Sequence, residues 1–174
     1  MNMNAKLKWL FARRSVRQYK PGEVPDSAVT DILEAAMAAP SAGGKDPWHF
    51  VVFRDRARLS RVAEGLPNGR MLESAAVGIA VCGELQRTHD RQESFLIQDC
   101  SAAVENILLA ATALGLGGCW LGVHPRTDRS AHIRKVLSIP EDVIPIAVVS
   151  IGWPSEPPQP RTRFNPSAVH YEAW

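Results

Sequence analysis

The sequence predicts a single domain, residues 1–174, in which helices and short strands alternate along the chain. Hydrophobic residues make up 45% and charged residues 22%, which is the balance of a globular protein with one sizeable core. Apolar residues recur at helical spacing in some segments and form short β-branched runs in others. The chain has no internal repeat, and its proline-rich stretch is too short to link two domains.

The first half of the chain predicts two helices and two strands. After Pro25, apolar residues recur at helical spacing up to Met37, and Pro40 ends the pattern. The aromatic and β-branched run 48–53 favours a strand, and the charged stretch 55–64 favours a helix. The small apolar residues 75–82 then predict a buried strand.

The second half contains the strongest element, a helix at about 93–114 whose broad apolar face predicts a central position. Gly115 ends this helix. The elements expected next are an extended segment at 119–123, a helix at 128–137 and a strand at 144–151. Beyond Gly152, four prolines predict an extended arm that runs over a surface toward Arg161.

Charge and composition argue against several classes of function. A net charge of +2 is too mild to argue for a nucleic-acid-binding protein, so that hypothesis stays weak and no nucleic-acid partner is expected. No apolar run reaches the roughly 18 residues of a membrane span, and the first residues lack the pattern of a signal peptide. We therefore expect a cytoplasmic protein without a membrane partner. The three cysteines are expected to be small buried residues, and the five histidines lack ligand spacing, so no bound metal is expected.

Two arginine clusters stand at opposite ends of the chain. Arg13, Arg14 and Arg17 form the first cluster, and Arg161 and Arg163 form the second. Taken alone, each cluster is more often solvated surface charge. Arginine, however, presents a planar fork of donors that matches phosphate oxygens and keeps its charge near neutrality. If the clusters converge, they form the phosphate site of a phosphorylated cofactor.

The glycine-rich stretch 115–122 has a composition that dinucleotide-binding loops also have. Here the glycines follow a helix and precede a strand, which is the reverse of the order that a dinucleotide site requires. Spacing alone predicts only the end of a helix. A close approach of the backbone to a planar ligand stays open as the functional alternative.

Four separated segments together resemble the nitroreductase family of flavoproteins. They are RRSVRQY at 13–19, APSAGGKDPW at 39–48, GLGGCWLG at 115–122, and GWPSE at 152–156 leading to RTR at 161–163. Their order and spacing cover nearly the whole chain. The resemblance implies an α+β fold in which helices flank a mixed, mainly antiparallel sheet. It also implies a homodimer with an extended C-terminal arm and with FMN bound at the subunit interface.

By this resemblance the FMN-binding residues are Arg13, Arg14, Ser15, Arg17, Pro40, Ser41, Ala42, Gly44, Trp120, Leu121, Gly122, Arg161 and Arg163. The segment 13–17 and the later arginine pair would hold the phosphate, the ribityl chain and the pyrimidine edge. The segment 40–42 would reach the flavin of the partner subunit. The backbone of 120–122 would lie along the isoalloxazine, with Trp120 as a candidate platform for flat substrates.

The chain departs from the family pattern in one loop. Gly44 and Asp46 stand where the family commonly has Asn and Gln. Gly44 lacks an amide that could bond to flavin or substrate, and Asp46 brings an anion close to the cofactor. We expect Asp46 to order the loop by pairing with Lys45, Arg17 or another cation.

The resemblance implies an enzyme that takes hydride from NADH or NADPH at flavin N5 and reduces nitroaromatics, quinones or similar acceptors by a ping-pong mechanism. No catalytic side chain is then required. Arg17 is the candidate that stabilises the anionic reduced flavin. The alternatives are a specialised branch of the family and an FMN carrier or sensor that does not turn over.

Overall fold

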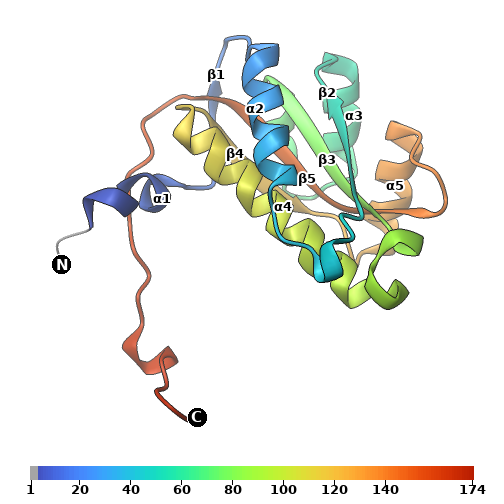
Figure 1. Cartoon of the computed structure of the whole chain (residues 1–174). Helices are drawn as coiled ribbons and strands as arrows, with labels where there is room; N and C mark the ends of the chain where they lie inside the picture. Colours follow the sequence, from blue (N-terminus) through green and yellow to red (C-terminus); the bar gives the residue numbers. More distant parts are fainter. Residues whose placement is uncertain (1–3) are drawn as a thin grey trace.

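The computed structural model describes residues 4–174, and each helix and strand expected from the sequence is present. In chain order the elements are α1 (Lys8–Ala12), β1 (Tyr19–Lys20), α2 (Asp26–Met37), β2 (Trp48–Phe53), α3 (Arg56–Glu64), β3 (Val77–Glu84), α4 (Glu93–Ala113), β4 (Gly117–Gly122), α5 (Thr127–Leu137) and β5 (Val143–Pro154). Figure 1 shows α2 and α4 on one face of the sheet and α3 and α5 on the other. The predicted α+β fold is therefore confirmed.

The sheet is built around β5, which pairs with β1, β3 and β4, and β2 pairs with β3. All of these pairs are antiparallel. One isolated parallel bridge joins Ser15 to Gly118 and so attaches the first arginine segment to β4. The long central strand thus brings the ends of the chain, β1 and the residues after β5, to the same part of the sheet.

Two cores lie on opposite faces of the sheet because alternate residues of each strand point to opposite sides. On β3, Val77, Ile79 and Val81 belong to the core under α2 and α4. Ala80 and Cys82 belong to the core under α3 and α5. Burial on both faces explains why β3 is apolar along most of its length rather than alternating with polar residues.

Helix α4 is the centre of the larger core. Its 21 residues give it the length and apolar composition of a membrane-crossing helix. In the structure, however, eight of its residues are buried among its neighbours, which is the behaviour of a core helix. One of the eight is a carboxylate, Asp99, and its partners are part of the candidate site.

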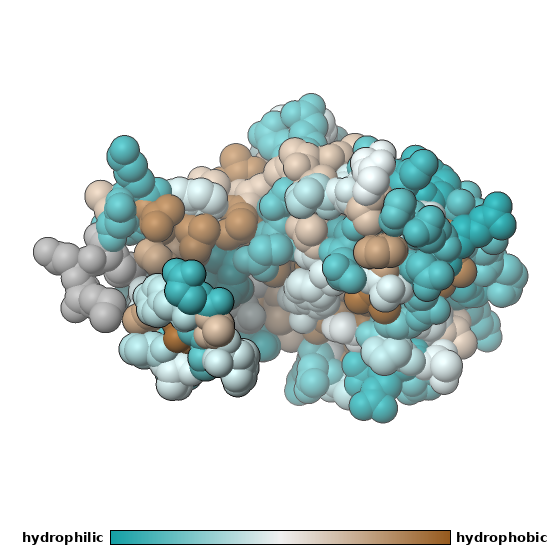
Figure 2. Space-filling view, turned by 60° about the horizontal axis from the view of Figure 1, so that its bottom comes forward, coloured by the Kyte–Doolittle hydropathy of each residue, from teal (hydrophilic) through white to brown (hydrophobic). Residues whose placement is uncertain are grey.

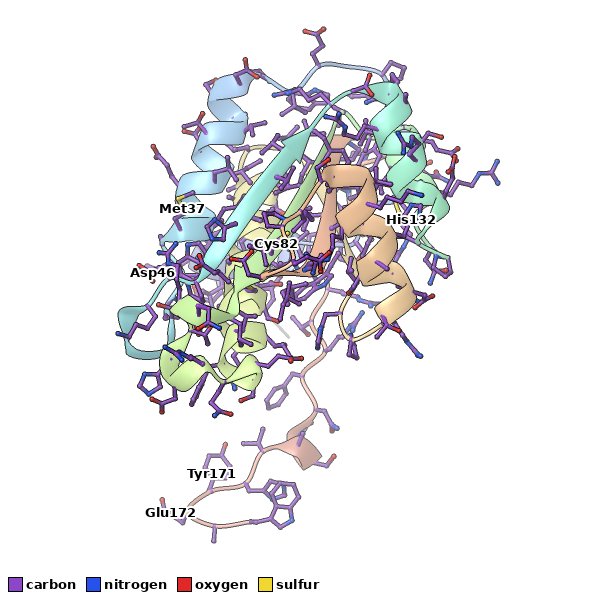
Figure 3. The ribbon with its side chains drawn as sticks, turned by 90° about the vertical axis from the view of Figure 1, so that its right-hand side faces the viewer. Met37, Asp46, Cys82, His132, Tyr171 and Glu172 are labelled. Atoms are coloured by element: carbon purple, nitrogen blue, oxygen red, sulfur yellow. The ribbon has the colours of Figure 1, made fainter. Side chains whose placement is uncertain are left out.

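The two ends of the described chain are the least buried parts. Leu7, just before α1, and Trp9 and Leu10 of α1 are exposed, and Figure 2 shows apolar surface gathered at one end of the molecule. The residues after β5 leave the body as an extended segment, and Figure 3 places Tyr171 and Glu172 at its far end. Residues 155–174 contain only the short 3-10 turn Pro166–Ala168 and are almost all exposed, and the predicted course of this arm over another surface stays a prediction.

Candidate functional site

The fold brings the two arginine clusters together. Arg13, Arg14, Arg161 and Arg163 line one cavity of about 400 Å³ with Ser15, Arg17 and Glu105. Arg14 Nη1 donates to the carbonyl of Gln159 (2.7 Å), and the backbone N–H of Arg161 donates to the carbonyl of Phe11 (3.2 Å). The neighbouring guanidiniums of Arg163 and Arg14 lower the pKa of Arg161. Such crowding of cations makes the cavity suited to an anion.

One acid balances part of this charge. Glu105 of α4 lies on the cavity wall, and its Oε1 is 3.6 Å from Nε of Arg13. Both side chains remain partly exposed, so this ion pair contributes little to stability. The ion pair with Glu105 orients the Arg13 side chain. The other arginines of the cavity make no ion pair within residues 4–174.

The first arginine segment is held against β4 by backbone contacts. The N–H of Val16 donates to the carbonyl of Gly118 (3.0 Å), and the Tyr19 hydroxyl donates to the carbonyl of Val16 (2.9 Å). Burial raises the pKa of Tyr19, so its hydroxyl stays neutral and available as a donor. A Cβ at residue 117 would lie 2.6 Å from Val16 Cγ2. Glycine at 117 therefore lets the arginine segment lie on the strand.

A second cavity, of about 550 Å³, opens beside the first and shares Arg17 with it. The β4 residues Trp120, Leu121 and Gly122 form one wall. Trp120 is 38% exposed, so its indole offers a flat apolar surface at the rim. No heavy atom lies within 4 Å of the position that a Cβ of Gly122 would take, which leaves the backbone open to a ligand.

The lining of the second cavity also contains polar residues that the sequence interpretation missed. Asn68 and Arg70 lie there, and Arg129 of α5 donates from Nη1 to the carbonyl of Gly122 (2.9 Å). The turn Pro67–Asn68–Gly69 between a helix and a strand was the available signal, because it places polar side chains at a strand entrance. It carries no spacing rule that points to a ligand, so only the fold connects it to β4.

The loop 40–46 lies outside both cavities and is tied to α4. The N–H of Ala42 donates to Asp99 Oδ1 (2.9 Å). Asp99 is only 4% exposed, and its second oxygen, Oδ2, has no hydrogen-bond partner among the described residues. Gly44, at φ +62°, is exposed and has nothing within 4 Å of a Cβ position. The expected contact of Pro40, Ser41 and Ala42 with a partner's flavin stays a prediction.

The expected role of Asp46 needs a correction. Its carboxylate accepts from the Ser41 hydroxyl (2.5 Å), and Ser41 Oγ accepts from the Asp46 N–H (3.0 Å). Asp46 makes no ion pair with Lys45, Arg17 or any other cation of residues 4–174, so the predicted pairing is wrong. Asp46 has a φ of +47°, and a bond back to a hydroxyl five residues earlier satisfies the carboxylate locally without a cation.

The remaining expectations concern buried residues. Cys82, Cys100 and Cys119 are free and buried, as predicted. Trp48, the first residue of β2, is 7% exposed and belongs to the core. Burial raises the pKa of Cys82 and of Cys100 to about 12, so neither thiol supplies a nucleophile near neutrality. The described residues hold no group of three or more His, Cys, Asp or Glu side chains placed to bind a metal.

Fold and site together define an α+β protein in which an arginine-lined cavity of about 400 Å³ adjoins a cavity of about 550 Å³ along a glycine-containing strand. The chain belongs to the nitroreductase family, whose model matches residues 10–66 and 58–153. A relative from Archaeoglobus fulgidus, assigned as an NADH dehydrogenase/NAD(P)H nitroreductase, is 44% identical over 97% of this chain and 98% of its own length.

Two solved structures extend this similarity. An FMN-dependent nitroreductase from Clostridium difficile is 29% identical, with a TM-score of 0.88, and the match covers 97% of this chain and 99% of that one. A Desulfovibrio desulfuricans protein assigned as a nitroreductase was solved in complex with FMN. It is 30% identical, with a TM-score of 0.83, and the match covers 99% of both chains.

Proposed function

We propose that this protein is an NAD(P)H-dependent oxidoreductase that binds FMN across its two adjoining cavities and reduces nitroaromatics, quinones or similar electron-poor acceptors. The observation that carries the proposal is Arg17, which lines both the arginine cavity and the cavity beside β4. FMN joins a phosphate to a planar ring through a ribityl chain, and the two cavities offer a cationic end and a flat end in that order. The residues present therefore fit this cofactor.

Each arginine has a distinct task in this arrangement. Arg13, Arg14, Arg161 and Arg163 bind the phosphate, because guanidinium forks match its oxygens and their crowding favours a dianion. Arg17 lies between phosphate and ring and places a cation near the pyrimidine edge. The carbonyl of Gly122 is already engaged by Arg129, so this part of β4 is held in place along the ring.

FMN, when bound, supplies the centre that takes hydride from NADH or NADPH and delivers electrons to the acceptor. The protein's own contribution is to bind, orient and balance charge, and no side chain of the two cavities needs to form a covalent intermediate. Trp120 at the rim provides a stacking surface for flat acceptors. A ping-pong order follows if donor and acceptor use the same open face of the ring in turn.

The homodimer is part of the proposal. The apolar residues exposed on α1 and the extended C-terminal arm are the surfaces that a second copy would cover. The loop 40–46 is held by α4 outside the two cavities described above, and it would complete the flavin site of the partner. A monomeric mass in solution at micromolar concentration, with FMN bound, would contradict this part.

The test is an anaerobic titration of the FMN-loaded protein with NADH and then NADPH, followed by a nitroaromatic and a quinone. We expect the flavin absorption band to bleach with a nicotinamide donor and to return with the acceptor. Arg163→Gln should weaken FMN binding about tenfold, since one charge-assisted hydrogen bond is worth roughly 1.5–3 kcal/mol. Arg58→Gln, which changes an exposed arginine of α3 outside both cavities, is the matched control.

The outcomes separate the alternatives. Bound FMN that neither nucleotide reduces would favour a carrier, a sensor or a specialised branch of the family. Absence of FMN binding would contradict the proposal as a whole. Equal loss of FMN affinity in Arg163→Gln and Arg58→Gln would mean that general surface charge, rather than the arginine cavity, attracts the phosphate.

A further inference from the structure

A second basic cavity lies away from the two described above, between the loop 41–46 and the turn that precedes α4. Its volume is about 680 Å³, and the residues that line it are Gly43, Lys45, Gln86, Arg87, Thr88, His89, Asp90 and Arg91. Figure 3 shows Asp46 at this loop, beside the segment leading into α4. We refer to it as the turn cavity.

The turn cavity concentrates positive charge. Lys45, Arg87 and Arg91 line it, and none of the three makes an ion pair within residues 4–174. Asp90 is its only lining acid, and the Asp90 carboxylate lies 3.4 Å from Nε2 of His89. Asp46 is close in sequence, but its carboxylate is bonded to the Ser41 hydroxyl. Three cations therefore face one partly engaged carboxylate.

Residues on both sides of the turn cavity have positive φ angles. Gly43 has φ +61°, and a Cβ there would lie 3.0 Å from Nδ1 of His89, so the loop and the turn are in close contact. On the other wall, Asp90 and Arg91 have φ values of +50° and +52°, which are uncommon for residues other than glycine. The His89 ring packs edge-on against Phe95, with centroids 5.3 Å apart. These contacts hold the turn against the loop.

The position of the turn cavity gives it a role in the proposed reaction, and this step rests on the proposed function. The segment 40–42 is the part of the loop proposed to reach the partner's flavin. Lys45 follows Ala42 by three residues, a span of at most about 11 Å for extended chain. Gly43 and Lys45, which line the turn cavity, therefore lie within a few residues of the segment proposed to contact the partner's flavin.

We propose that the turn cavity binds the 2′-phosphate of NADPH and makes the enzyme prefer NADPH to NADH. The two donors share their nicotinamide and pyrophosphate, and they differ only in that phosphate. A phosphate monoester is close to a dianion at neutral pH. Two arginines and a lysine on one concave surface match its charge, and arginine adds bidentate geometry. Arginine is also the residue that accommodates the 2′-phosphate in other NADP sites.

The kinetic test compares kcat/KM for NADPH and NADH at one ionic strength, using the FMN-loaded wild type and single variants. We expect the wild type to prefer NADPH by about tenfold or more. Arg87→Gln and Arg91→Gln should each lower kcat/KM for NADPH about tenfold while changing that for NADH less than twofold. Arg58→Gln, an exposed change on α3 outside the turn cavity, should leave both values unchanged. Equal losses for both donors, or a wild-type preference for NADH, would overturn the proposal.

A binding test separates this proposal from the proposed function. Adenosine 2′,5′-bisphosphate and 5′-AMP differ only in the 2′-phosphate, and calorimetry can measure the binding of each without turnover. We expect the bisphosphate to bind about tenfold more tightly and to lose this advantage in Arg87→Gln. If neither donor bleaches the flavin but this difference persists, the proposed function fails and the turn cavity stands. If the two ligands bind equally, the 2′-phosphate site is refuted whatever the activity.

Discussion

Gly117→Ala is the change that tests how the arginine segment is attached to β4. The new methyl group would lie 2.6, 2.7 and 2.9 Å from Val16 Cγ2, Cβ and Cγ1, which is well inside ordinary contact. Val16 cannot simply move away, because its N–H is bonded to the carbonyl of Gly118. Overpacking of this kind costs typically about 1–3 kcal/mol. We therefore expect Gly117→Ala to lower the free energy of unfolding by that amount.

The same displacement should weaken FMN binding, because Ser15 and Arg17 flank Val16 and line the arginine cavity. A loss of about 1.4 kcal/mol of contact corresponds to a factor of ten in the dissociation constant. Urea unfolding measures the first effect, and titration of FMN fluorescence measures the second. Gly122→Ala is the control for stability, since nothing lies within 4 Å of its Cβ position.

The double variant Val16→Ala, Gly117→Ala removes two of the three close contacts and should recover part of the lost stability, which a double-mutant cycle would register as coupling. The reasoning is refuted if Gly117→Ala is as stable as Gly122→Ala. It is also refuted if Gly117→Ala is destabilised while its FMN affinity is unchanged, because the arginine segment would then bind phosphate independently of its place on β4.

Three further predictions concern the loop, the arginine cavity and the buried thiols. Asp99→Ala removes the acceptor of the Ala42 N–H and should raise the FMN dissociation constant about fivefold, a loss of about 1 kcal/mol. Asp99→Asn keeps an acceptor and should raise the constant less. Equal FMN dissociation constants for the two variants would show that this hydrogen bond does not hold the loop. FMN affinity should fall as salt rises, and Arg163→Gln should reduce that dependence in a binding titration; parallel curves would contradict a charged cavity. Burial raises the pKa of the Cys82 and Cys100 thiols from 9.0 to about 12. A thiol reagent at pH 8 should therefore react with them only after unfolding, and rapid reaction in the folded state would refute their burial. Their contribution to the free energy of unfolding should be complete below pH 9 and should decline toward pH 12, because the thiols ionise first in the unfolded state.

The fold was predictable from the sequence where an element carries its own periodic signal. The strand 48–53 was located closely because it is a run of aromatic and β-branched residues, and the helix at 93–114 because its apolar residues recur along a broad face. Helix α1, with five residues, and β1, with two, were missed. Such short elements have no periodicity to detect. They form because β5 and α4 provide partners, and that information is absent from the local sequence.

The residues of the candidate site also differ in how far the sequence alone predicted them. The arginine clusters were recognisable because arginine pairs are chemically distinctive, and the structure brings them to one cavity although Arg161 lies 147 positions after Arg14. Asn68 and Arg70 lie in a turn that has no diagnostic pattern, so only the fold shows that they face β4. Asp46 was assigned a cation because charge suggests a charged partner, whereas the nearby Ser41 hydroxyl satisfies it at lower entropic cost.

The arginine cavity also explains why the end of the chain can be so lightly held. Few contacts attach this segment, among them the bonds from Arg161 N–H to Phe11 and from Arg14 to Gln159. Like charges crowd it, as the lowered pKa of Arg161 indicates. Without an anion these charges repel one another, and this repulsion destabilises the docked position of the C-terminal segment. A bound phosphate turns that repulsion into attraction, and its binding energy adds to stability by mass action. Cofactor binding and the docking of the C-terminal segment are therefore expected to be one coupled event.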